Sequence, residues 1–137
     1  MYERTLVLIK PDGVMKGVEQ AIVEHYRNAG LRVARRFMFK FRHIEAENFY
    51  NEHRGRFYFE GLVLAMTSGQ CVAVFLEGEN AIELVRRLNG ATDPAKAEPG
   101  TIRHDFRSAG GPFNTVHASD SMEAYHKEAL IVTKYEP

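Results

Sequence analysis

Short apolar runs of strand length alternate along this chain with segments whose apolar residues recur at helical spacing, and this order limits the available folds. The clearest run is Cys-Val-Ala-Val-Phe-Leu at residues 71–76. Another, residues 4–10, ends at Pro11-Asp12-Gly13, which predicts a turn. Gly30 is a natural stop for a helix that begins near Val18. The predicted strands are residues 4–10, 31–42, 71–76 and 130–132, and the predicted helices are residues 18–29, 45–54, 60–67, 81–88 and 121–127.

This order contains two βαβ-type units, which are consistent with an α+β, ferredoxin-like sandwich. The periodicity leaves the order of the strands in the sheet open. A long segment, roughly residues 89–116, is rich in glycine and proline and reads as a loop. A loop of this length is unusual inside a compact domain, so we expect it to have a function.

The length and composition suit one globular domain. The chain has 137 residues, of which 45% are hydrophobic and 26% are charged. Eighteen basic and eighteen acidic residues cancel, which argues against a protein that binds nucleic acid through bulk charge. Cys71 is the only cysteine, so an intrachain disulfide and an all-cysteine metal cluster are excluded. With no signal-like N-terminal run and no stretch of about 18 apolar residues, we expect a cytoplasmic enzyme without a membrane partner.

A histidine stands in the stretch Asn-Thr-Val-His-Ala-Ser-Asp at residues 114–120. Imidazole is the side chain best suited to take up and give back a group near neutral pH, since its ordinary pKa is about 6.5. A nucleophilic ring nitrogen needs an acceptor that holds the other ring nitrogen, and Glu128 follows His117 by eleven residues. Ser119 could cap the helix predicted after it. The stretch therefore offers His117 as a candidate nucleophile and Glu128 as a candidate acceptor, although a structural histidine and a solvated glutamate are the alternatives.

Cations that could neutralise an incoming anionic group are also present. Lys10 ends a predicted buried strand, so its ammonium should emerge at the edge of the sheet. Arg86 lies on the helix before the long loop and Arg103 lies inside that loop. Arginine is suited to bidentate contact with phosphate. The chain has no Gly-x-x-x-x-Gly-Lys-[Ser/Thr] segment, which excludes a Walker-type phosphate loop.

Four motifs occur in a fixed order along the chain. They are Lys10-Pro11-Asp12-Gly13, then Glu77-Gly78 with Gly90-x-Thr92-x-Pro94, then Pro99-Gly100-Thr101-Ile102-Arg103, and finally Asn114-x-x-His117-Ala118-Ser119-Asp120-Ser121. In these motifs the chain resembles the nucleoside diphosphate kinases, from about residue 4 to about residue 131. The resemblance implies a single nucleoside diphosphate kinase-like domain over residues 1–137, with a four-stranded antiparallel sheet. It also implies an enzyme that transfers the γ-phosphate of a nucleoside triphosphate to a nucleoside diphosphate by a ping-pong mechanism.

The resemblance implies a role for each matched residue. Nδ1 of His117 would attack the terminal phosphate, and the ring would become phosphohistidine. Ser119 would bond Glu128, in addition to or in place of capping the helix. Lys10 and Asn114 would meet the sugar 3′-hydroxyl and a phosphate oxygen, and Tyr58 would stack on the base beside Leu62. The catalytic residues implied are His117, Glu128, Ser119, Lys10 and Tyr50, and the nucleotide-binding residues implied are Lys10, Tyr58, Leu62, Arg86, Thr92, Arg103 and Asn114.

The cofactor and partners expected from the resemblance are Mg²⁺, nucleotides and further copies of the chain. Mg²⁺ keeps much of its water and binds mainly through substrate phosphates, so we expect no dedicated set of protein ligands. The nucleotide partners are nucleoside di- and triphosphates, and no specific nucleic acid is expected. The resemblance favours a homo-oligomer built from dimers, with a hexamer preferred over a tetramer.

One departure from the family and two rival functions stay open. An extra residue falls between Arg103 and His117, within residues 107–113, so the residue that faces the base from this stretch is unassigned. A nucleotide-sensing module without turnover is one rival, and the presence of Lys10, Arg103, His117 and Glu128 argues against it. A ferredoxin-like nucleic-acid-binding domain is the other, and the zero net charge argues against it. Nucleotide preference, the physiological donor and any regulatory role are not determined by the sequence.

Overall fold

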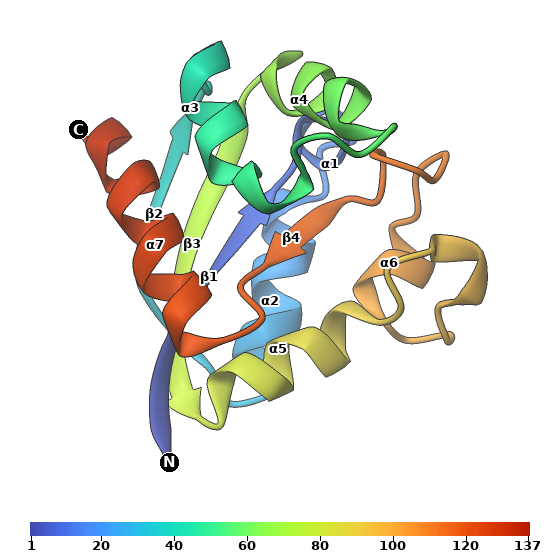
Figure 1. Cartoon of the computed structure of the whole chain (residues 1–137). Coiled ribbons are helices and arrows are strands. Elements are labelled where there is room, and N and C mark those ends of the chain that lie inside the picture. The colour runs from blue at the N-terminus through green and yellow to red at the C-terminus, as the bar shows by residue number, and fades with distance from the viewer.

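The sheet at the centre of the molecule has four strands in the order β2-β3-β1-β4, and every neighbouring pair is antiparallel (Figure 1). The structure is a computed structural model that describes residues 1–137. The strands are β1 (Tyr2–Ile9), β2 (Arg32–Phe39), β3 (Cys71–Glu79) and β4 (Val116–Ala118). The α-helices are α1 (Pro11–Met15), α2 (Glu19–Asn28), α3 (His43–Phe49), α4 (Phe59–Thr67), α5 (Ala81–Asn89), α6 (Ile102–Asp105) and α7 (Met122–Val132), and the short 3₁₀ helices are η1 (Asn51–His53), η2 (Pro94–Lys96) and η3 (Thr133–Tyr135). None of these helices combines the length and apolar character that a membrane crossing requires.

The core lies on both faces of the sheet because β1 and β3 are apolar on both. Successive side chains of a strand point to opposite faces. In β1, Leu6 and Leu8 therefore pack with α3, α4 and α7, whereas Val7 and Ile9 pack with α2 and α5. All four side chains are fully buried. The predicted α+β, ferredoxin-like sandwich with a four-stranded antiparallel sheet is confirmed.

The prediction of the fourth strand was wrong. Residues 130–132 do not form a strand but the last turn of α7, and the fourth strand is β4, which pairs with β1. β4 has only three residues, which is too short for an alternating pattern to be recognised in the sequence. Its central residue is His117, which lies opposite Leu8 of β1. The histidine that stands out in the sequence is thereby placed on a rigid element.

Three further segments differ from their predicted form. Residues 11–13, expected as a turn, begin helix α1, because proline is well tolerated at the first position of a helix. The predicted helix over residues 45–54 divides into α3 and η1. The segment expected as a loop, residues 89–116, contains η2 and the four-residue α6. These short helices give local hydrogen bonding to a segment that is otherwise irregular.

Candidate active site

A cavity of about 650 Å³ opens between α4, α5 and α6 and the ends of β1 and β4. Every residue that the sequence placed in catalysis or nucleotide binding lines this cavity except Ser119 and Glu128, which lie beside it. The predicted residues that line it are Lys10, Tyr50, Tyr58, Leu62, Arg86, Thr92, Arg103, Asn114 and His117. The fold thus brings cations, aromatic rings and one imidazole from distant parts of the chain to one place.

One ring nitrogen of His117 is hydrogen-bonded within the protein, and the other is not. Its Nε2 lies 2.9 Å from Oε1 of Glu128, and Nδ1 has no hydrogen-bond partner within the protein. Phe49 and Tyr50 pack against the ring at centroid distances of 5.0 and 5.7 Å, both in an edge-on arrangement. Because a carboxylate only accepts hydrogen bonds, the contact with Glu128 places the ring proton on Nε2. The lone pair of a neutral His117 is therefore on Nδ1.

Ser119 acts on the same carboxylate and is not a helix cap. Its hydroxyl donates to Oε1 of Glu128 at 2.8 Å, and the residue is fully buried. The hydrogen bond that caps α7 is made instead by Ser121, whose hydroxyl oxygen accepts from the amide of Ala124. The prediction that Ser119 caps the helix was wrong, because β4 ends at Ala118 and α7 begins only at Met122, so that the cap position falls on Ser121.

Lys10 lines the cavity and is buried, with 4% of its surface exposed. Its ammonium donates to Oδ1 of Asn114 at 2.8 Å. The side-chain Nδ2 of Asn114 in turn donates to the backbone carbonyl of Thr92 at 3.1 Å. Burial lowers the pKa of Lys10 to about 8, and the positive charge of Arg103 acts in the same direction. The side chain is therefore a cation near neutral pH and a neutral amine in alkaline solution.

Arg103 joins α6 to two other backbone segments at the cavity wall, one at Gly90 and one at residues 114–116. Its guanidinium donates to the carbonyls of Gly90 at 2.9 Å, Val116 at 2.8 Å and Asn114 at 3.3 Å. Burial lowers the pKa of this guanidinium, and the nearby Arg86 adds to the effect. The planar fork of an arginine can make several such bonds and still present N–H groups to a ligand. Arg103 thus has a structural role in addition to lining the cavity.

Aromatic side chains form another part of the wall. The hydroxyl of Tyr50 is buried without a hydrogen-bond partner, and burial raises its pKa. The hydroxyl of Tyr58 lies 2.6 Å from Nδ1 of His53, while Phe57 is 98% exposed. Leu62 of α4 adds an apolar surface. An unpaired buried hydroxyl beside His117 is a group that a ligand could satisfy.

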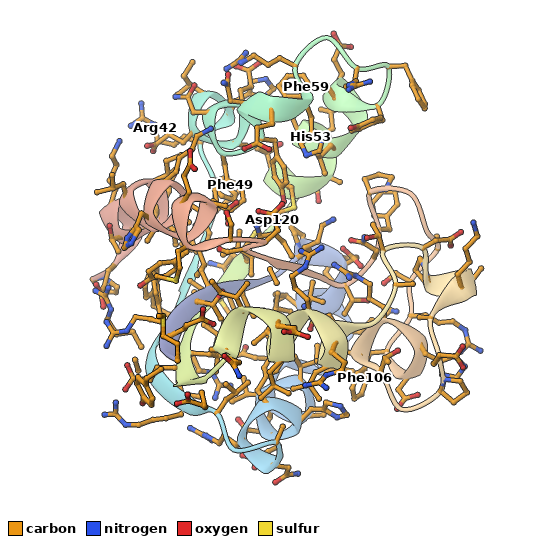
Figure 2. All side chains as sticks on the ribbon, turned by 60° about the horizontal axis from the view of Figure 1, so that its bottom comes forward. Arg42, Phe49, His53, Phe59, Phe106 and Asp120 are labelled. Carbon is orange, nitrogen blue, oxygen red and sulfur yellow. The ribbon has the colours of Figure 1, made fainter.

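Seven lining residues were not predicted as site residues: His53, Phe57, Gly111, Pro112, Val116, Ala118 and Asp120. Asp120 stands in the same motif as His117 and could have been found from it. His53 and Asp120, both labelled in Figure 2, lie on the side of the cavity nearest α3 and α7. Gly111 and Pro112 come from residues 107–113, where the extra residue prevented an assignment. Three lining cations, Lys10, Arg86 and Arg103, face a single lining carboxylate, so the cavity suits an anionic ligand.

Similarity to known proteins agrees with this chemistry. The family described as Nucleoside diphosphate kinase matches residues 3–136. The Nucleoside diphosphate kinase of Methanocaldococcus jannaschii is 43% identical over 134 residues, which cover 98% of this chain and 95% of the relative. That of Hyperthermus butylicus is 48% identical over 126 residues, which cover 92% of this chain and 88% of the relative.

Solved structures of nucleoside diphosphate kinases have the same fold as this chain. A crystal form of the Aquifex aeolicus nucleoside diphosphate kinase has a TM-score of 0.92 and 38% identity, covering 96% of this chain and 95% of that one. A halophilic nucleoside diphosphate kinase from Halobacterium salinarum, solved in complex with CDP, has a TM-score of 0.90 and 37% identity, covering 96% and 87%. The chain therefore belongs to the nucleoside diphosphate kinase family, in which a phosphate group is transferred between nucleotides.

Proposed function

We propose that this chain transfers the γ-phosphate of a nucleoside triphosphate to a nucleoside diphosphate through a phosphohistidine on His117. The lone pair on Nδ1 attacks the γ-phosphorus, and the bond from phosphorus to the β,γ-bridging oxygen breaks. The first nucleoside diphosphate leaves with that electron pair. A terminal phosphate oxygen of a second nucleoside diphosphate then attacks the same phosphorus, and the N–P bond breaks. This ping-pong sequence divides one difficult transfer into two easier ones.

The observation that carries this proposal is the 2.9 Å contact between Nε2 of His117 and Glu128. In a neutral ring this contact holds the proton on Nε2 and leaves Nδ1 as the free nucleophilic nitrogen. When Nδ1 accepts the phosphorus, the ring becomes positively charged, and the Glu128 carboxylate stabilises that charge. Ser119 keeps the carboxylate in place through its own hydrogen bond. Both contacts therefore favour the phosphorylated ring over a free one.

The remaining predicted residues would bind the substrate in the same cavity. Arg86, Thr92 and Arg103 would hold the phosphates, where phosphoryl transfer depends on positioning and on neutralising charge. Lys10 and Asn114 are hydrogen-bonded to each other and would meet the sugar 3′-hydroxyl and a phosphate oxygen.

The apolar and aromatic part of the cavity would bind the base. Tyr58 and Leu62 would pack on its face, and stacking tolerates any base because each has a π face. The buried hydroxyl of Tyr50 would find a partner near His117. Gly111 and Pro112 are the candidates from residues 107–113 for the opposite side of the base.

We propose Mg²⁺ as the divalent cation that accompanies the nucleotide. No cluster of three or more histidine, cysteine or acidic side chains could hold a metal ion by itself, and Asp120 is the only carboxylate that lines the cavity. This donor set fits a hydrated ion bound chiefly through the phosphates, with Asp120 available to its water shell. When bound, such an ion would neutralise part of the phosphate charge.

We also propose that residues 1–137 act as one nucleoside diphosphate kinase-like domain that assembles from dimers into a hexamer or a tetramer. One continuous sheet with a core cluster on each face supports the single domain. The cytoplasmic location expected from the sequence stays a prediction.

Transfer of a radioactive γ-phosphate tests the proposed function. Purified protein mixed with γ-labelled ATP and Mg²⁺ should become labelled, and a chase with any nucleoside diphosphate should remove the label. The bond should be labile in acid and stable in base, as expected for phosphohistidine. His117→Ala should abolish labelling, whereas His126→Ala, on the outer surface of α7, should not. An acid-stable label, or labelling of His117→Ala, would refute the mechanism.

A further inference from the structure

A strained turn lies between two residues that line the cavity. Thr115 has a φ of 73°, and the amide of Val116 donates to the carbonyl of Asn114 at 2.8 Å. A hydrogen bond between residues i and i+2 around a positive φ describes the rarer, strained form of the γ-turn. Asn80 is the only other non-glycine residue with a positive φ, and asparagine tolerates it far better than a β-branched residue. Thr115 therefore keeps this conformation only because its surroundings impose it.

The position of this turn links it to the chemistry. Asn114, which precedes Thr115, contacts Lys10 in the cavity, and His117 follows two residues later on β4. Arg103 donates to the carbonyls on either side of Thr115. A turn of a different shape would change the separation between the Asn114 amide and the His117 ring. The strained conformation thus determines how two groups of the site face each other.

The groups that impose the turn come from the long loop, where the carbonyl of Phe106 accepts the hydroxyl of Thr115 at 2.8 Å, and from the segment after β1. Oδ2 of Asp12 accepts the amide of Thr115 at 3.0 Å, and the amide of Lys10 donates to the carbonyl of Thr115 at 2.9 Å. Oδ2 of Asp12 also accepts the hydroxyl of Ser108 at 2.6 Å. A Cβ on Gly13 would lie 3.0 Å from the carbonyl oxygen of Thr115, so α1 can approach the turn this closely only with glycine there. Asp12 is partly buried and does not line the cavity.

We propose that Asp12 is a positioning residue that holds the strained turn at Thr115 and, through it, sets Asn114 and His117 for phosphoryl transfer. The inference rests on the proposed function, because its main measurement is phosphoryl transfer. A different role for Asp12 would be electrostatic, since its negative charge lies near the Lys10 ammonium. The two roles make opposite predictions for a neutral side chain of the same shape.

Two substitutions of Asp12 separate the hydrogen bonds from the charge. Asp12→Ala removes both hydrogen bonds and should lower kcat and the single-turnover rate of His117 phosphorylation by at least about tenfold, as misplacement of reacting groups does. Asp12→Asn keeps an oxygen that can accept from both Thr115 and Ser108, so it should restore the rate to within about threefold of the unsubstituted protein. If Asp12→Asn is as slow as Asp12→Ala, the charge matters and the positioning role is overturned.

A double-mutant cycle with Thr115 tests whether Asp12 acts through the turn. Glycine adopts a positive φ without strain, so in Thr115→Gly the turn should no longer depend on the hydrogen bonds of Asp12. Asp12→Ala should then lower kcat by less than about threefold when it is introduced into Thr115→Gly, whereas it lowers kcat by at least about tenfold in the original chain. An equal loss in both backgrounds would overturn the proposal. Asp105→Ala is the matched control, because its carboxylate also accepts one backbone amide, from Gly100 at 3.1 Å, without lining the cavity.

Urea unfolding of the same four proteins gives a readout that is independent of turnover. Asp12→Ala should lower the midpoint clearly in the original chain and much less in Thr115→Gly. If Asp12→Ala alone fails to fold, its recovery by Thr115→Gly supports the proposal, and failure of the double variant to fold overturns it. If the unsubstituted protein transfers no phosphate, the proposed function fails. In that case the urea midpoints still test whether Asp12 holds the turn. If Asp12→Ala lowers the midpoint equally in the original chain and in Thr115→Gly, this role is overturned as well. If it lowers the midpoint much less in Thr115→Gly, the role is supported.

Discussion

At the scale of single residues, Glu128 is the group that we propose to orient His117. Its Oε1 accepts from Nε2 of His117 at 2.9 Å and from the hydroxyl of Ser119 at 2.8 Å. We predict that Glu128→Gln lowers kcat about ten- to a hundredfold, because a charged acceptor contributes about 1.5–3 kcal/mol where a neutral one contributes less. Steady-state and single-turnover phosphorylation rates measure this. Ser119→Ala, which removes one hydrogen bond and no charge, should cost less, and a Glu128→Gln rate within twofold of the original would contradict the role of the carboxylate.

Lys10 gives the site a pH dependence on the alkaline side. Its pKa is lowered to about 8, first by burial, so its charge is lost as the pH rises through that value. We predict that the dissociation constant of a nucleotide increases between pH 7 and pH 9.5, because a neutral amine attracts phosphate weakly. Calorimetric titration across that range measures the effect. A constant affinity would show that Lys10 stays charged or does not contact the phosphates.

The same shift makes a prediction for stability. An unfolded chain keeps the lysine proton up to a pKa of about 10.4, whereas the folded protein releases it near 8, so the unfolded state binds more protons between these values. The contribution of Lys10 to stability should therefore rise with pH in this window. Lys10→Met, which cannot titrate, should remove that rise from the urea midpoint, and an identical pH profile in both proteins would contradict the assignment.

At the scale of elements, Arg103 connects α6 to the end of α5 and the start of β4. It does so through three carbonyls, those of Gly90, Asn114 and Val116. Lysine has one ammonium in place of a planar fork and cannot reach all three. We predict that Arg103→Lys lowers the free energy of unfolding by about 2–4 kcal/mol, since hydrogen bonds from charged groups contribute about 1.5–3 kcal/mol each and lysine retains some. Urea unfolding measures this, and Arg87→Lys on the exposed face of α5 should leave stability unchanged.

At the scale of the whole molecule, strand β2 is an unpaired edge of the sheet. It pairs only with β3, and Met38 on it is 46% exposed. A long edge strand with exposed apolar residues is usually covered in a stable protein. We predict that the chain forms a homo-oligomer, with a hexamer favoured over a tetramer. Light scattering at micromolar concentration should give a multiple of 15.6 kDa; the monomer mass would refute assembly, and a four-subunit mass would refute only the hexamer.

The local patterns of the sequence determined most of the elements and the chemistry of the site. The runs at residues 4–10, 31–42 and 71–76 became β1, β2 and β3, because a strand buried on one or both faces has a recognisable apolar pattern. Four motifs in a fixed order, of which the one around His117 is the last, carried the resemblance to the family. The residues expected near that histidine were carried over from the resemblance, and the contact between His117 and Glu128 agrees with it.

Only the tertiary structure decided the features that depend on long-range contacts. β4 has three residues and is a strand only because β1 offers a free edge, so its pattern was too short to recognise, and residues 130–132 were mistaken for it. The hydrogen bonds of Arg103 join backbone groups that no side-chain pattern reveals. The strain at Thr115 likewise exists only where the segment after β1 meets the end of the long loop. Local sequence encodes periodicity and side-chain chemistry, whereas pairing of short strands and imposed backbone strain are properties of the folded chain as a whole.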